Sequence, residues 1–170
     1  MSKENIVLIG IMGSGKTTVG KAVADRLGLT FIDLDQYIED RWGSIPSLFE
    51  KGEEHFRDIE AKAVQEVCEF EGVVIATGGG VIKRDENITA LKKKGRLFFL
   101  DRPIEEILSD IQTSHRPLLK DGKNKLKELY EERYPLYRKA CDVHIQEVKS
   151  VKDAVNIVIR EWEQLRSIQK

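Results

Sequence analysis

The stretch GIMGSGKT at residues 10–17 constrains the fold of this chain more than any other part of the sequence. It fills every fixed position of the glycine-rich phosphate-loop pattern, follows an apolar run at residues 6–9 and precedes a segment with helical periodicity. Glycines let the backbone turn its N–H groups towards an anion, and the N-terminus of the next helix adds partial positive charge. The stretch therefore predicts a buried strand, a polyphosphate-binding loop and a helix. The alternative is a turn that binds no ligand.

Two side chains of this loop have expected roles in binding ATP. Lys16 is expected to reach the β- and γ-phosphates as a point charge. The hydroxyl of Thr17 is expected to ligate the Mg²⁺ that bridges these phosphates. The sequence thus predicts a protein that binds ATP together with Mg²⁺.

The bulk properties favour one domain without a highly charged partner. The 170 residues include 28 Lys and Arg against 29 Asp and Glu, so no global field favours nucleic acid or an acidic membrane. No apolar run approaches the roughly 18 residues of a bilayer-spanning helix, and the first residues lack the pattern of a secretory signal. These observations predict a cytoplasmic protein. A nearly neutral surface with no long exposed apolar stripe predicts a monomer.

The two cysteines, Cys68 and Cys141, are too few for a disulfide framework, and we expect both to be free thiols. Cys141 and His144 have the spacing of half a metal site. No second pair of ligands in the sequence completes such a site, so small residues near the start of a strand are the favoured interpretation.

Short apolar runs alternate with helical periodicity along the chain. The expected strands cover residues 5–10, 30–32, 73–76, 96–100 and 142–145. The expected helices cover residues 15–27, 36–41, most of 45–71 with a break at Gly52, 86–94, 104–111, 125–140 with an interruption near Pro135, and a last helix from residue 151. This alternation predicts an α/β fold of three layers, in which helices flank a five-stranded parallel sheet. In such a sheet, ligands bind at the carboxyl ends of the strands.

Two polar features follow expected strands and so should lie at this edge. Asp33 and Asp35 end the second strand, and in an extended segment their side chains point to opposite sides. Three consecutive glycines, residues 78–80, follow the third strand. Because each glycine loses backbone entropy on folding, close approach of the backbone to a ligand explains them better than stability does. A merely flexible turn is the alternative.

Other polar features are expected on helices and in one loop. Arg57 and Glu60 lie three residues apart on a helix, and a solvated ion pair is the simplest interpretation of them alone. Arg133 and Tyr137 lie four apart on another helix. Residues 113–125 form a polar break that contains Pro117 and Gly122, which is typical of a mobile lid beside a phosphate site or of a surface loop.

The remaining patterns narrow the class of nucleotide-binding protein. The chain lacks the Asn-Lys-x-Asp sequence with which GTPases specify guanine, and it is too short for the coupling elements of motors. Asp101 follows an apolar strand, but the Arg102-Pro103 that comes next favours a connection to a helix over a metal-binding carboxylate. Asp33 is therefore the expected carboxylate near Mg²⁺. The arginines indicate a small anionic acceptor, because guanidinium groups bind carboxylates through two parallel hydrogen bonds.

Taken in order, these motifs resemble those of the shikimate kinases from the first strand to the last helix. The matching motifs are residues 10–18, Asp33-x-Asp35, Gly52-Glu53 with Phe56-Arg57 and Glu60, Thr77 to Gly80, Arg116-Pro-Leu-Leu and Arg133-x-Pro-Leu-Tyr137. The resemblance implies a fold like that of the nucleoside monophosphate kinases, with one kinase domain over residues 1–170, a lid at about 112–125 and a substrate-binding helical region at about 34–62. It also implies transfer of the γ-phosphate of ATP to the 3-hydroxyl of shikimate, a step towards chorismate and the aromatic amino acids.

The resemblance also assigns roles to single residues. Asp35 matches the carboxylate that holds the ring hydroxyls of shikimate and aligns the acceptor, and Asp33 matches the residue that supports Mg²⁺. Arg57 and Arg133 match the pair that grips the substrate carboxylate, and Arg116 matches the lid arginine that closes over the ATP phosphates. The backbone of Gly78, Gly79 and Gly80 completes the acceptor site. The residues assigned to the nucleotide are Gly13, Ser14, Gly15, Lys16, Thr17, Thr18 and Arg116, and those assigned to catalysis are Lys16, Asp35 and Arg116.

Some positions leave the pattern open. Glu60 is expected to orient Arg57, and Cys141 replaces the alanine common before Asp142. Residues 146–150, where the family holds adenine, show no clear match. Two alternatives to the main interpretation are a kinase for another small hydroxy acid such as gluconate, and a catalytically silent nucleotide-binding module.

Overall fold

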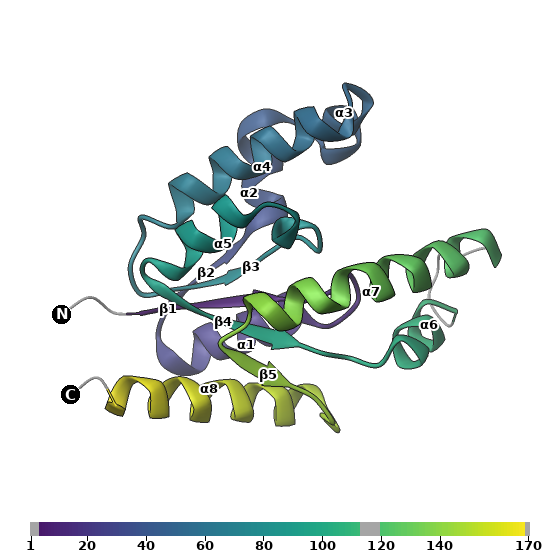
Figure 1. Ribbon diagram of the computed structural model, residues 1–170. Helices are drawn as coiled ribbons and strands as arrows, with labels where there is room; N and C mark the ends of the chain where they lie inside the picture. The colour runs from purple at the N-terminus through teal and green to yellow at the C-terminus, as the bar shows by residue number, and fades with distance from the viewer. Residues whose placement is uncertain (1–3, 113–119, 169–170) are drawn as a thin grey trace.

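The computed structural model describes residues 4–112 and 120–168. Within these residues the chain forms one five-stranded parallel sheet with the order β2-β3-β1-β4-β5 (Figure 1). The strands are β1 (Asn5–Ile9), β2 (Thr30–Asp33), β3 (Val73–Ala76), β4 (Gly95–Leu100) and β5 (Val143–Ile145). The strand that precedes the phosphate loop is therefore the central strand, and the loop leaves the middle of the carboxyl edge.

Helices cover both faces of the sheet and make three layers, as expected. The helices are α1 (Lys16–Leu27), α2 (Leu34–Trp42), α3 (Ile45–Glu50), α4 (Glu53–Val67), α5 (Asp85–Lys92), α6 (Ile104–Gln112), α7 (Lys120–Ala140) and α8 (Val151–Ile168), with a 3₁₀ turn, η1 (Val81–Lys83). Figure 1 shows α1 and α8 along one face, α2, α4 and α5 on the other, and α7 extending past the carboxyl edge of the sheet.

Alternation along β1 explains why the sheet has two apolar faces. Val7 and Ile9 pack into the core under α2, α4, α5 and α7, whereas Ile6 and Leu8 pack into the core under α1 and α8. All four side chains are fully buried. Burial of each contributes about 1.5–3 kcal/mol, so both cores hold the central strand and the start of the phosphate loop in place.

Local signals set several of the boundaries. Gly28 adopts the left-handed conformation, with a φ of 67°, and ends α1 as the sequence predicts. The Ser44 side chain accepts a hydrogen bond from the Ser47 N–H at 3.3 Å and so caps α3. No helix within the described ranges is long and apolar enough to cross a membrane.

Three sequence expectations about local structure are wrong. Asp35 is not in an extended segment, because β2 ends at Asp33 and α2 begins at Leu34. Helix α7 is not interrupted at Pro135, an exposed position where water can solvate the carbonyl that the proline leaves without an N–H donor. This helix also starts at Lys120 and not near residue 125, so the last part of the expected lid is helical. Residues 113–119 of that lid lie outside the described residues.

Candidate active site

The phosphate loop has the backbone and the cation that an anion-binding loop requires. Gly13 and Gly15 have φ values of 82° and 96°, a region that glycine adopts without strain. The ammonium group of Lys16 donates to two carbonyl oxygens of the loop, at 2.5 and 3.0 Å. Its residue is only 9% exposed. Burial lowers the pKa of Lys16 to about 8, and the charge of Asp35 opposes this shift. Lys16 is therefore a desolvated cation at the edge of the sheet.

A cavity of about 560 Å³ opens beside this loop. Its walls are the loop itself, residues 100–103 at the end of β4 and just after it, and residues 148–151 at the start of α8. The volume lies in the range of small-molecule sites. The hydroxyl of Ser14 is buried here without a hydrogen-bond partner among the described residues, so it is a free donor for a phosphate oxygen. Residues 148–150, which belong to the segment 146–150 that carried no motif, thus contribute the far wall of the cavity.

Thr17 and Asp33 lie together at the start of α1 and the end of β2. The hydroxyl of Thr17 donates to one carboxylate oxygen of Asp33 at 3.2 Å. The other oxygen of Asp33 accepts the backbone N–H of Gln36 at 3.2 Å and caps α2. The cap fixes the rotamer of Asp33, so a hydroxyl and a carboxylate oxygen, both ligand types that Mg²⁺ prefers, are held side by side.

Asp35 lies in the first turn of α2, where its carboxylate is exposed at the edge of the sheet but crowded by neighbouring groups. Desolvation raises the pKa of Asp35, the nearby charge of Asp33 adds to the rise, and Lys16 opposes it. A carboxylate with a raised pKa is a better proton acceptor than an ordinary one. It lies close to Gly78, where an added Cβ would be 2.9 Å from an Asp35 oxygen.

The three consecutive glycines, residues 78–80, let three charged side chains pack directly against the backbone. A Cβ at Gly79 would lie 3.2 Å from Nη1 of Arg133, and a Cβ at Gly80 would lie 2.6 Å from Cζ of Arg57. Neither glycine has a positive φ, so the reason for glycine at these positions is space and not backbone conformation. The triplet therefore brings Asp35, Arg57 and Arg133 around one spot.

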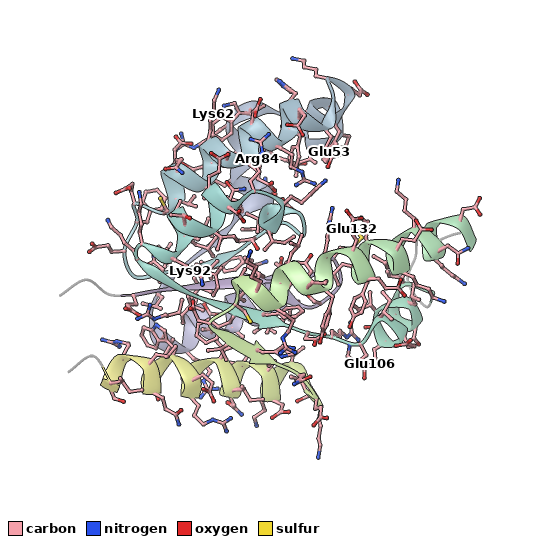
Figure 2. All side chains as sticks on the ribbon, viewed as in Figure 1. Glu53, Lys62, Arg84, Lys92, Glu106 and Glu132 are labelled. Carbon is pink, nitrogen blue, oxygen red and sulfur yellow. The ribbon has the colours of Figure 1, made fainter. Side chains whose placement is uncertain are left out.

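Arg57 and Glu60 form a buried ion pair on α4. Nη1 of Arg57 lies 2.9 Å from Oε1 of Glu60, and their side chains are 8% and 1% exposed. Desolvation raises the pKa of Glu60, and the charge of Arg57 opposes the rise. The solvated-pair interpretation is therefore wrong. Glu53 lies 3.5 Å from Nε of Arg57 and 2.5 Å from Nζ of Lys83, so Glu53 links this helix to η1 just after the glycines. Figure 2 labels Glu53, the first residue of α4.

Helix α7 brings Arg133 and Tyr137 to the other side of the glycines. The hydroxyl of Tyr137 donates to the carbonyl oxygen of Gly79 at 2.6 Å, and the residue is 1% exposed. Desolvation raises the pKa of Tyr137 to about 12, with Arg133 opposing, so the hydroxyl stays a donor at all ordinary pH values. Arg133 is half-buried, with its guanidinium facing Gly79.

Two residues after β4 take part in this edge without having been expected there. Arg102 donates to the carbonyl oxygen of Gly13 at 3.0 Å. Asp101 accepts hydrogen bonds from side chains of α7 and β5 and also lines the cavity. The sequence predicts only a connection at Asp101, because its partners are 29 or more positions away and give no local signal.

The structure thus brings most of the expected site residues to one edge of the sheet. Arg116 lies outside the described residues. Both cysteines are free, and no group of three or more potential metal ligands of the His, Cys, Asp and Glu types occurs in the described parts of the chain. The half-site of Cys141 and His144 is not completed there. His144 instead contacts Asp101.

Comparison with known proteins gives one family. A sequence model described as shikimate kinase matches residues 12–163. A curated shikimate kinase from Clostridium botulinum (strain Eklund 17B / Type B) is 52% identical over 140 residues, which cover 82% of this chain and 85% of the relative.

Solved structures agree. A shikimate kinase from Acinetobacter baumannii in complex with shikimate superposes with a TM-score of 0.84 at 35% identity, covering 97% of this chain and 94% of that one. A gluconokinase from Sinorhizobium meliloti 1021 has a TM-score of 0.68 at 17% identity, with 98% of each chain covered. The second likeness shows the fold alone.

Proposed function

Because the chain belongs to the shikimate kinase family, we propose that the side chains gathered at the carboxyl edge of its sheet have separate roles in the phosphorylation of shikimate. The protein is an ATP-dependent kinase that transfers the γ-phosphate to the 3-hydroxyl of shikimate, giving shikimate 3-phosphate and ADP. This reaction belongs to the shikimate pathway, which leads to chorismate and the aromatic amino acids.

One observation carries the division of roles. Asp35 and two arginines lie against the glycine triplet that follows β3, and the phosphate loop follows the neighbouring strand, β1. An acceptor with one carboxylate and several hydroxyls suits this set, since paired guanidinium groups bind a carboxylate and a carboxylate accepts from hydroxyls. Arg57 and Arg133 would hold the shikimate carboxylate between them. Gly78, Gly79 and Gly80 would line the acceptor closely, and Glu60 would keep Arg57 in place.

On this arrangement the chemistry is positioning and electrostatic stabilisation. Asp35 would hold the 3-hydroxyl in line with the γ-phosphate and accept its proton, which fits its raised pKa. Lys16 would neutralise charge on the β- and γ-phosphates as the bond to the leaving oxygen breaks. Arg116, in the lid proposed at about 112–125, would close over the phosphates and exclude water. The other proposed nucleotide contacts are Gly13, Ser14, Gly15, Thr17 and Thr18.

The donor set at Thr17 and Asp33 fits Mg²⁺, which prefers oxygen ligands and keeps several waters. Thr17 would ligate the ion directly, and Asp33 would hold it directly or through water. When bound, Mg²⁺ supplies charge neutralisation between the β- and γ-phosphates. The 3.2 Å contact between the two side chains keeps both oxygens turned towards the same point.

The proposal extends to the state of the protein in the cell. The large exposed hydrophobic side chains of the described chain are Met12, Phe49, Phe70, Leu136, Val151 and Ile168, and the two that share an element lie at opposite ends of α8. Because these side chains form no continuous stripe along any described element, we expect a monomer. Two free thiols and the use of ATP favour the cytoplasm.

The test of the division of roles is a pair of kinetic measurements. ADP release with Mg-ATP is followed at varied shikimate, with gluconate as a parallel acceptor. In Arg57→Ala and Arg133→Ala, the KM for shikimate should rise at least tenfold, while the KM for ATP stays within about twofold, because only the acceptor loses a charge-assisted contact. Unchanged KM values for shikimate would remove both arginines from the acceptor site. ADP release with gluconate but not with shikimate would contradict shikimate as the acceptor.

A further inference from the structure

Asp101 is the centre of a buried polar cluster that none of the roles above uses. Its carboxylate accepts from the hydroxyl of Tyr134 at 2.8 Å and from the hydroxyl of Tyr130 at 3.3 Å. Nε2 of His144 lies 2.7 Å from the oxygen that Tyr134 contacts. The side chains of Asp101 and His144 are 8% and 14% exposed. A carboxylate so well supplied with partners fixes them in place, since breaking any contact leaves a buried charge poorly satisfied.

Packing around Phe99 makes this cluster rigid. The imidazole of His144 stacks on the Phe99 ring, with centroids 5.1 Å apart and planes within 9°. The rings of Tyr134 and Tyr137 lie 5.6 and 5.0 Å from the same ring. Because Phe99 belongs to β4, next to the central strand, the cluster ties α7 to the most buried part of the sheet.

Hydroxyl groups thus anchor α7 at two neighbouring points of the carboxyl edge. Tyr137 reaches the glycine turn after β3 through the Gly79 carbonyl, and Tyr134 reaches the residue after β4. These positions, together with Tyr130, are spaced i, i+4 and i+7, so they form one face of the helix. Arg133 lies next to this face, beside Tyr137. The two anchors therefore set the rotation of α7 about its own axis, and with it the place of Arg133.

We propose that Asp101 and Tyr134 are positioning residues for the acceptor, which hold Arg133 at the distance from the glycine triplet that shikimate binding requires. This inference rests on the acceptor role proposed for Arg133. The hydroxyl of Tyr134 donates to Asp101 and not to any of the residues proposed to contact shikimate. Its effect on the reaction would pass through the helix.

Helix geometry makes small rotations costly. The Cα atoms lie about 2.3 Å from the helix axis, so a rotation of about 15° moves the Cα of Arg133 by roughly 0.6 Å and its guanidinium by more. A misplacement of about 1 Å at a substrate contact costs on the order of 10²-fold in rate. Pro135, which follows Tyr134, removes one backbone hydrogen bond from this turn, so the side-chain anchors carry more of the alignment.

The first experiment compares Tyr134→Phe with Ser167→Ala. Both remove one hydroxyl, but the hydroxyl of Ser167 donates to the carbonyl oxygen of Gln164 near the end of α8, outside the cluster and outside the proposed site. In Tyr134→Phe, kcat/KM for shikimate should fall about tenfold, with the KM for ATP within about twofold, whereas Ser167→Ala should leave both within about twofold. Calorimetric titration with shikimate gives the affinity independently of turnover. Asp101→Asn keeps an oxygen that accepts from Tyr134 and should retain more shikimate affinity than Asp101→Ala.

A double-mutant cycle with Arg133→Ala separates this inference from the proposed function. If Tyr134 acts through Arg133, adding Tyr134→Phe to Arg133→Ala should cost less than about twofold more in shikimate affinity. A further tenfold loss on that background, or an equal rise of both KM values in Tyr134→Phe, would overturn the positioning role. So would a folded Tyr134→Phe with normal shikimate affinity while Arg133→Ala is impaired. Normal affinity in Arg133→Ala itself would instead refute the acceptor role of Arg133, and the inference with it.

Discussion

Gly80→Ala is the sharpest test of how closely the backbone must approach Arg57. The φ and ψ of Gly80 are −97° and 7°, which alanine adopts in ordinary turns, so the substitution introduces no backbone strain. The added methyl group would lie 2.6 Å from Cζ of Arg57, whereas ordinary contacts are 3.4–4 Å. The guanidinium must therefore retreat by about 1 Å. The perturbation is purely steric and falls on one side chain.

The size of the effect follows from what holds Arg57. Its retreat stretches the 2.9 Å contact with Glu60, a carboxylate that is 1% exposed. A displacement of about 1 Å at a substrate contact costs on the order of 10²-fold, or about 2.7 kcal/mol of transition-state stabilisation. We expect kcat/KM for shikimate to fall about 30- to 100-fold, with the KM for ATP within about twofold. Overpacking should also lower the free energy of unfolding by about 1–3 kcal/mol and Tm by roughly 2–10 °C.

The assay is ADP release, first with shikimate varied at saturating ATP and then the reverse, together with thermal unfolding. Gly28→Ala is the matched control. No atom lies within 4 Å of a Cβ at Gly28, but its φ is 67°, so this variant adds strain without a clash. It should lose about 1 kcal/mol of stability and keep both KM values. A folded Gly80→Ala with a shikimate KM within twofold of the unmodified protein would refute the close approach of Arg57 to the glycines.

Three further predictions concern other groups. Asp35→Asn should keep ATP affinity in calorimetry but lose about 10²- to 10⁴-fold in kcat, and near-normal turnover would remove Asp35 from proton transfer. Asp33→Asn keeps the cap on α2 and therefore the stability, because asparagine is an equally good N-cap. Because the variant loses the carboxylate charge, the Mg²⁺ concentration that gives half-maximal rate should rise several-fold. An unaltered Mg²⁺ dependence would contradict the metal site. Burial raises the pKa of both thiols, so less thiolate forms at a given pH. Alkylation of Cys68 and Cys141 by iodoacetamide should therefore be slow at pH 7.5 and accelerate above pH 9. Rapid labelling at pH 7.5 would show that the thiols are not protected.

Local patterns predicted the features that depend on neighbouring residues. The phosphate loop, the order of strands and helices, the Ser44 cap and the Gly28 terminus each follow from residues a few positions apart. The parallel sheet follows from their alternation, because parallel strands need a helix between them. These parts of the fold could therefore be predicted from the sequence.

What the sequence left open depends on contacts between distant segments. Arg57 and Glu60 looked like a surface pair because their spacing on a helix says nothing about what covers them, and it is the glycine turn about 20 positions later that buries Arg57. Asp101 has partners on α7 and β5, and no local pattern specifies a carboxylate shared by two tyrosines and a histidine. The roles of Asp35, Arg133 and the other expected site residues stay predictions until the variants are measured.

The central place of β1 has a consequence for how the chain folds as it is made. This strand is wholly buried and precedes the other strands of the described sheet in the chain, yet its neighbours β3 and β4 end only at Ala76 and Leu100. At synthesis rates of about 5–20 residues per second, β1 waits roughly 5–20 s for its second neighbour. During that time an apolar strand with unpaired edges is exposed to other chains. We therefore expect the growing chain to need protection by chaperones, and the phosphate loop to acquire its binding shape only after β4 has been made.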